Sequence, residues 1–132
     1  MVTYDEIAQM IDHSLLSPTL TDKDIEEGCR IARDYRVATV CCRPSDVILA
    51  KKLLEGSNVG TTTVIGFPHG TTTTDVKVFE ANEAINNGCV ELDVVLNIGK
   101  HRSGNYEFVK NDLKAVTDLC HKRGIIVKVI FD

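Results

Sequence analysis

Apolar positions along the chain alternate between two spacings, one typical of buried strands and one typical of amphipathic helices. Short apolar runs rich in β-branched residues predict strands at residues 37–42, 61–66, 90–96 and 125–131. A brief extended segment at residues 11–13 precedes them. The pattern therefore predicts five strands.

Segments with helical spacing lie between the predicted strands, and a short helix is predicted at residues 3–10. Thr21 and Asp24 have the spacing of a capping box, with Asp in place of Glu. Pro44 and Ser45 open a further helix, and residues 103–105 cap the last one. The four intervening helices have apolar stripes over Ile25, Cys29 and Ala32; Val47, Ala50 and Leu54; Val78, Ala81 and Ile85; and Val109, Leu113, Val116 and Cys120.

Regular alternation of strands and helices predicts an α/β fold with parallel strands. Two architectures fit this pattern. One is an open doubly wound sheet of the flavodoxin type. The other is the first part of a (β/α)₈ barrel, which needs about 250 residues when complete. Neither a Gly-rich fingerprint after the first strand nor a P-loop motif is present, which disfavours nucleotide binding.

Length and composition indicate a soluble globular protein. The 132 residues suffice for a single domain, 1–132, and 43% of them are hydrophobic. The net charge of −4, with scattered basic residues, argues against nucleic-acid and anionic-membrane partners. No run of about 18 apolar residues predicts a membrane span. The N-terminus has no basic segment typical of a signal peptide, so we expect a cytoplasmic protein.

The five cysteines include no CxxC pair, so reduced and mostly buried thiols are expected rather than a disulfide framework or zinc site. The histidines show no HxH or HxxxH spacing. We therefore expect neither a metal nor a cofactor.

Two charged residues lie inside strands that should be buried on both faces, Asp93 and Lys128. Isolated charges there are costly, so pairing is expected. Burial would also favour their neutral forms, as suits proton transfer. The simpler alternative is a plain buried ion pair between consecutive strands. Glu91 would share the face of Asp93, or form a salt bridge where its strand begins.

Other polar residues at strand ends are weaker candidates. Asp12 follows Ile11 in the first short strand, although such a carboxylate is commonly a turn or capping group. Of Cys41 and Cys42, only one can face a site, because adjacent strand residues point to opposite faces. His69 lies on a loop after a strand and is equally consistent with a solvated histidine.

An ordered set of motifs resembles the deoxyribose-phosphate aldolase family. Residues 11–16 (IDHSLL) resemble its IDHTLL opening, and residues 64–70 (VIGFPHG) its VxGFPxG loop. Residues 89–99 (CVELDVVLNIG) resemble its ADEIDMVINIG segment. Residues 37–41, 77–85, 103–106 and 127–130 continue the match, which covers essentially the whole chain in order.

This resemblance implies a metal-free class I aldolase on a (β/α)₈ barrel, here a partial barrel of about five parallel strands. The family cleaves 2-deoxyribose 5-phosphate reversibly to glyceraldehyde 3-phosphate and acetaldehyde, in deoxyribonucleoside catabolism. A lysine on the sixth strand forms a Schiff base. By position, Asp93 matches the proton-transfer aspartate, and Lys128 and Asp12 match members of its polar network. Ser14 matches a threonine near the substrate, and Cys41 a cysteine near the aldehyde site.

The resemblance ends with the family's fifth strand, so the Schiff-base lysine, its partner lysine and the phosphate-binding loops fall outside these residues. Three hypotheses follow. The first is an aldolase whose C-terminal half is supplied elsewhere, acting on a small phosphorylated sugar. The second is a non-enzymatic half-barrel that self-associates or complements such a half. The third is an enzyme that uses Lys128 itself as an amine catalyst.

The two strand edges of a five-stranded partial barrel lead to a first prediction. Unpaired edges invite association. We expect the purified chain to form a homo-oligomer, or to bind a C-terminal half of a related aldolase. Light scattering measures the molar mass of the species in solution. A stable, monodisperse monomer that does not bind the added half would contradict the prediction.

Overall fold

Five strands run in chain order through the structure, a computed structural model that describes residues 1–131. The strand order is β1-β2-β3-β4-β5. An open doubly wound sheet would reverse its order at a switch point, and no such reversal occurs among the described residues. The strands are β1 (Asp12–Leu15), β2 (Thr39–Cys42), β3 (Gly60–Ile65), β4 (Glu91–Val95) and β5 (Ile126–Ile130).

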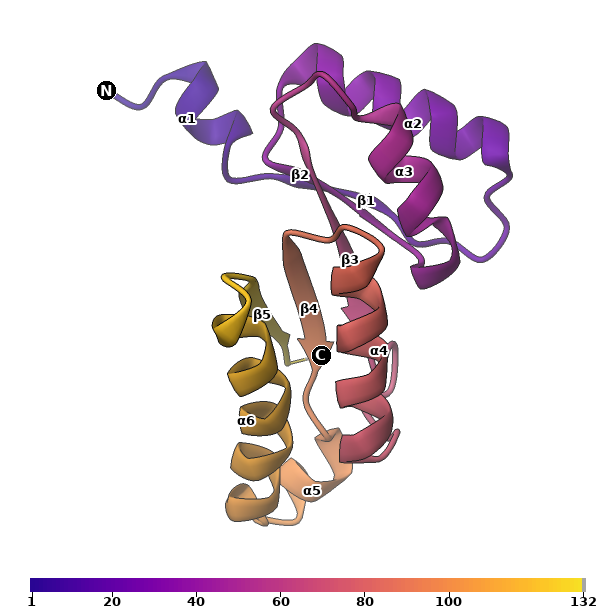
Figure 1. The fold of residues 1–132 in the computed structure, drawn as a ribbon. Coiled ribbons are helices and arrows are strands. Elements are labelled where there is room, and N and C mark those ends of the chain that lie inside the picture. Colours follow the sequence, from indigo (N-terminus) through magenta and orange to yellow (C-terminus); the bar gives the residue numbers. More distant parts are fainter. Residues whose placement is uncertain (132) are drawn as a thin grey trace. The chain divides into compact units, whose positions relative to one another are not determined.

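Helices occupy the predicted positions between the strands (Figure 1). The pattern missed one short helix after β4, which Asn97 caps by accepting from the Lys100 N–H. Five residues are too few to display a helical period, so sequence spacing gives no signal there. The helices are α1 (Tyr4–Ala8), α2 (Asp22–Tyr35), η1 (Pro44–Asp46), α3 (Val47–Leu53), α4 (Thr74–Asn86), α5 (Ile98–Arg102) and α6 (Tyr106–Lys122).

The chain divides into two compact units, Met1–Thr63 and a second that begins at Val64. In the first unit, β1 pairs with β2 and β2 with β3, all in parallel. The predicted capping box starts α2, because the Thr21 hydroxyl accepts from the Asp24 N–H and the Asp24 side chain accepts from Thr21. These bonds from Thr21 hold the pKa of Asp24 below its usual range.

In the second unit, α4 and α6 lie side by side along the parallel pair β4–β5 (Figure 1). The predicted stripe of α4 is only partly correct. Ala81 and Ile85 are buried, but Val78 is half-buried, while Lys77 is fully buried with Asp112 of α6. A charged pair therefore occupies a helix interface that the apolar spacing did not reveal.

All five cysteines are buried thiols outside any disulfide, as predicted. Burial raises the pKa of the Cys29 thiol to about 11, and burial also raises that of Cys120. Thiols in this state react slowly at neutral pH. They fill the core as small apolar side chains.

The last strand is less buried than its apolar sequence predicts. Every residue of β5 after Ile126 is half-buried, and Ile126 itself is 55% exposed. The expectation that both faces of this strand would be covered is therefore wrong for the described residues. β4, its neighbour, buries Leu92, Val94 and Val95 completely.

Gly70 offers a direct test of packing at the end of β4. Its φ is +67°, and a Cβ placed there would lie 2.0 Å from the Leu96 carbonyl oxygen. Gly104 has a similar φ of +72° but open space around it. We expect Gly104→Ala to lower the free energy of unfolding by about 1 kcal/mol, and Gly70→Ala by about 3 kcal/mol. Urea denaturation of both variants measures the difference, and equal losses would contradict the close contact with Leu96.

Candidate functional site

Three charged side chains meet on one face of the β4–β5 pair. The parallel register places Asp93 opposite Lys128, and Glu91 shares the face of Asp93 because strand side chains alternate. Lys128 Nζ lies 3.1 Å from Asp93 Oδ1 and 3.1 Å from Glu91 Oε2. The predicted pairing of Asp93 with Lys128 is confirmed, and Glu91 joins it.

This cluster is only partly shielded from water. The side chain of Lys128 is 37% exposed, against 14% for Asp93 and 19% for Glu91. The expectation that both charges of the pair would be buried on both faces is therefore wrong for Lys128. The half-exposed strand β5 explains this exposure. An accessible ammonium group between two carboxylates can bind an oxygen of a small polar ligand and relay protons to it.

The other candidates occupy the first unit. Asp12 and Ser14 lie on one face of β1, and the register places them opposite Thr39 and Cys41 of β2. The Thr39 hydroxyl donates to Asp12 Oδ1 at 2.6 Å. Ser14 is exposed, whereas Cys41 is only 3% exposed. The structure thus groups Asp12 with Ser14 and Cys41, and groups Asp93 with Lys128.

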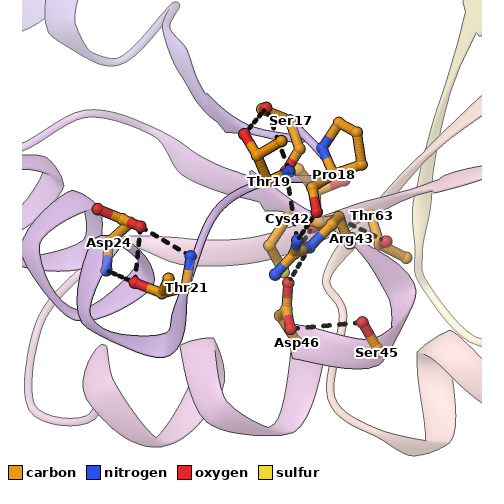
Figure 2. A network of polar contacts seen from close by, with 11 residues as sticks. Ser17, Pro18, Thr19, Thr21, Asp24, Cys42, Arg43, Ser45, Asp46 and Thr63 are labelled. Carbon is orange, nitrogen blue, oxygen red and sulfur yellow. Dashed lines mark hydrogen bonds and ion pairs between the residues drawn. The ribbon is translucent and has the colours of Figure 1, made fainter.

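A polar network fixes the chain where β1 and β2 end (Figure 2). Arg43, directly after β2, forms an ion pair with Asp46 and donates to the carbonyl oxygens of Ser17 and Pro18, each at 3.2 Å. The hydrogen bond to Asp46 raises the pKa of Arg43. This arrangement ties the loop after β1 to the start of η1.

Sequence reasoning did not single out these supporting residues. The spacing of Arg43 and Asp46, three apart at a helix start, was a usable signal for their pairing. Thr39 carried none, because threonine is common in strands and its bond to Asp12 depends on the register between β1 and β2.

His69 is exposed on the loop between β3 and α4, consistent with a solvated histidine. Within residues 1–131, no three His, Cys, Asp or Glu side chains are arranged to hold a metal ion. No helix in the same range is long and apolar enough to cross a membrane.

Comparison with known proteins gives the family. The profile of the DeoC/LacD family of aldolases matches residues 6–130. The chain belongs to this aldolase family. It is 46% identical over 129 residues to the deoxyribose-phosphate aldolase of Rhodopirellula baltica, covering 98% of this chain and 54% of that protein. It is 43% identical to the enzyme of Treponema denticola, covering 96% of this chain and 59% of that protein. The chain thus spans little more than half the length of these curated relatives and corresponds to their N-terminal part.

Solved aldolases have the same arrangement of strands and helices. The tetrameric deoxyribose phosphate aldolase from Aeropyrum pernix matches with a TM-score of 0.86 and 32% identity, over 96% of this chain and 53% of that one. The aldolase QR15 matches with a TM-score of 0.88 and 35% identity, over 96% of this chain and 56% of that one. The expected α/β class is confirmed, with the partial barrel favoured over the doubly wound sheet.

The ion-paired cluster on β4 and β5 predicts how stability depends on pH. Lys128→Met leaves the carboxylates of Glu91 and Asp93 on one face without the cation they share, so their negative charges repel each other in the folded variant. Protonation of either carboxylate removes this repulsion, so the loss of stability is present at neutral pH and shrinks as pH falls through the carboxyl range. We expect the variant to be about 1 kcal/mol less stable at pH 7, with the deficit shrinking toward pH 3.

Urea denaturation at the two pH values tests this expectation. Lys114→Met is the matched control, because Lys114 forms an exposed i,i+4 pair with Asp118 on α6. Its loss should be no more than about 0.5 kcal/mol. Two outcomes would contradict an ion-paired cluster of Lys128 with Asp93 and Glu91. One is the same loss of stability in both variants, and the other is a loss in Lys128→Met that does not depend on pH.

Proposed function

We propose that this chain supplies the N-terminal half of a deoxyribose-phosphate aldolase site. The reaction is the reversible cleavage of 2-deoxyribose 5-phosphate to glyceraldehyde 3-phosphate and acetaldehyde. The observation that carries the proposal is the cluster of Asp93, Lys128 and Glu91. It lies in the two segments, 89–99 and 127–130, whose sequence resembles the family's fourth and fifth strands.

Asp93 is proposed to serve in proton transfer, through an ordered water. Retro-aldol cleavage breaks the C2–C3 bond and needs a base to take the proton of the C3 hydroxyl, because C3 becomes the aldehyde carbon of glyceraldehyde 3-phosphate. The electron pair of the broken bond passes into the Schiff base of the family's sixth-strand lysine, which lies beyond these 132 residues. Lys128 offsets the charge of Asp93 at 3.1 Å and so keeps two carboxylates compatible on one face.

The remaining residues are proposed to shape the substrate side. Asp12, which accepts from the Thr39 hydroxyl, is proposed to act as the family's first-strand aspartate, and the exposed Ser14 is available to a sugar hydroxyl. Cys41 is buried and suits a wall of the aldehyde site rather than a nucleophile. The proposed setting is cytoplasmic deoxyribonucleoside catabolism, with no cofactor.

Lys128 as the amine catalyst is the less favoured alternative. Two carboxylates within 3.1 Å of its Nζ stabilise the charged ammonium form. An ammonium group has no lone pair with which to attack a carbonyl carbon. Borohydride trapping with Lys128→Ala separates the cases, since trapping that survives this substitution excludes Lys128 as the site.

A non-enzymatic half-barrel is the second candidate function, and the exposure of β5 favours it. Ile126 is 55% exposed and Phe131 78% exposed in a segment of strongly apolar sequence. Apolar strands left in this state favour association with another copy or with a complementary half.

A coupled assay for glyceraldehyde 3-phosphate release tests the proposed activity. The purified chain is measured with and without a separately made C-terminal half from a related aldolase. We expect activity only with the added half. Asp93→Asn should then lower kcat about 10²- to 10⁴-fold, as for removal of a proton-transfer group.

Asp118→Asn is the matched control, since Asp118 is an exposed carboxylate on α6 whose pKa is lowered by its hydrogen bond from Lys114. Equal activities for the two Asn variants would contradict the role of Asp93. No activity, with binding of the two halves demonstrated, would favour the non-enzymatic half-barrel.

A further inference from the structure

One lysine of the second unit is completely enclosed, although no candidate site includes it. The side chain of Lys77 on α4 is 0% exposed. Its Nζ donates to Asp112 Oδ2 of α6 at 2.6 Å and to the Val95 carbonyl oxygen at 3.0 Å. Asp112 is 1% exposed and also accepts from the Thr74 hydroxyl at 2.7 Å.

Joining α4 to α6 does not by itself account for this arrangement. A buried ion pair pays a large desolvation cost, and well-packed apolar side chains of similar volume stabilise a helix interface as well or better. Ala81, Ile85 and Val116 already provide apolar packing in these two helices. The distinctive feature of Lys77 is the bond that leaves the helix pair and reaches β4.

That bond holds one specific peptide group. The Val95 carbonyl and the Leu96 N–H belong to the same peptide, at the end of β4. Lys77 Nζ donates to the carbonyl, and the N–H donates to the Ile130 oxygen of β5 at 3.2 Å. The peptide is therefore fixed from both sides, and Asp93 lies two residues before it.

The same helix also holds the end of β3. Glu80, one turn after Lys77, accepts from the Gly66 N–H at 2.9 Å. Gly66 starts the loop that ends at Gly70, which packs closely on the Leu96 carbonyl. In parallel α/β folds, functional groups gather at the carboxyl ends of the strands. Lys77 and Glu80 thus fix the two strand ends next to which a site would form.

We propose that Lys77, held by Asp112, is a positioning residue that sets the carboxyl end of β4 and thereby the placement of Asp93 against Lys128. This inference rests on the proposed function only for the chemical role of Asp93. The geometric part concerns the chain alone and can be tested without any activity.

The test uses the double variant Lys77→Met with Asp112→Leu, which removes both buried charges together. The matched control is Lys114→Met with Asp118→Leu, an exposed pair on α6. Stability comes from urea denaturation. Amide hydrogen exchange of Leu96 and NMR titration of the Lys128 side chain report on the end of β4 and on the cluster.

We expect the double variant to fold with stability close to that of the parent chain. Its Leu96 amide should exchange at least about tenfold faster, because a charged hydrogen bond to that peptide is lost. The titration midpoint of Lys128 should also move, whereas the control variant leaves both readouts unchanged. Parent-like exchange and titration in the folded double variant would overturn the proposal.

If the double variant does not fold, Thr74→Val gives the same test. It removes the hydroxyl that orients Asp112 and keeps both charges. Changes in both readouts in the same direction support the proposal, and unchanged readouts overturn it.

Activity with an added C-terminal half keeps the two claims apart. In an active complex, the double variant should lower kcat about 10- to 100-fold at nearly constant KM. If the complex is inactive but the double variant changes the exchange of the Leu96 amide and the titration of Lys128, the proposed function fails and the positioning role of Lys77 is still supported. Parent-like kcat would overturn the positioning role while the function stands.

Discussion

The register between β4 and β5 is the constraint on which the candidate site depends. It places Asp93 opposite Lys128, and the alternation of side chains adds Glu91 to the same face. A slip of one residue would send one partner to the opposite face and leave a charge among the apolar residues that cover the strands. The ion pair and the apolar packing therefore select the same register, and the charges are tolerated in these strands because they are paired.

The surroundings of this strand pair show how the fold holds a polar cluster. On the helix side, Leu92 and Val94 are fully buried, and α4 places Lys77 and Glu80 at the ends of β4 and β3. In the first unit, Arg43 and Asp46 tie together the loops after β1 and β2 in a similar way (Figure 2). In both units, a charged side chain bonded to main-chain oxygens fixes the chain beyond the end of a strand.

Much of the fold could be predicted from sequence because its signals are local. The capping box of Thr21 and Asp24, and the five strands, follow from spacing within a few residues. The pairing of Asp93 with Lys128 was also predictable, since consecutive parallel strands are neighbours. The burial of Lys77 was not predictable, because its partners Asp112 and Val95 are distant in sequence and its position on α4 resembles that of an ordinary exposed lysine.

The exposure of β5 was missed for a related reason. An apolar run shows that a strand can be buried, whereas its actual exposure depends on what covers it.

A double-mutant cycle between Asp93 and Lys128 tests the central claim most directly. The free energies of unfolding of Asp93→Asn, Lys128→Met and the double variant are compared with that of the parent chain at pH 7. The register predicts a favourable coupling of about 0.5–3 kcal/mol between the two side chains. A coupling of zero within error would show that the two residues do not meet across β4 and β5, and would contradict the account of the site.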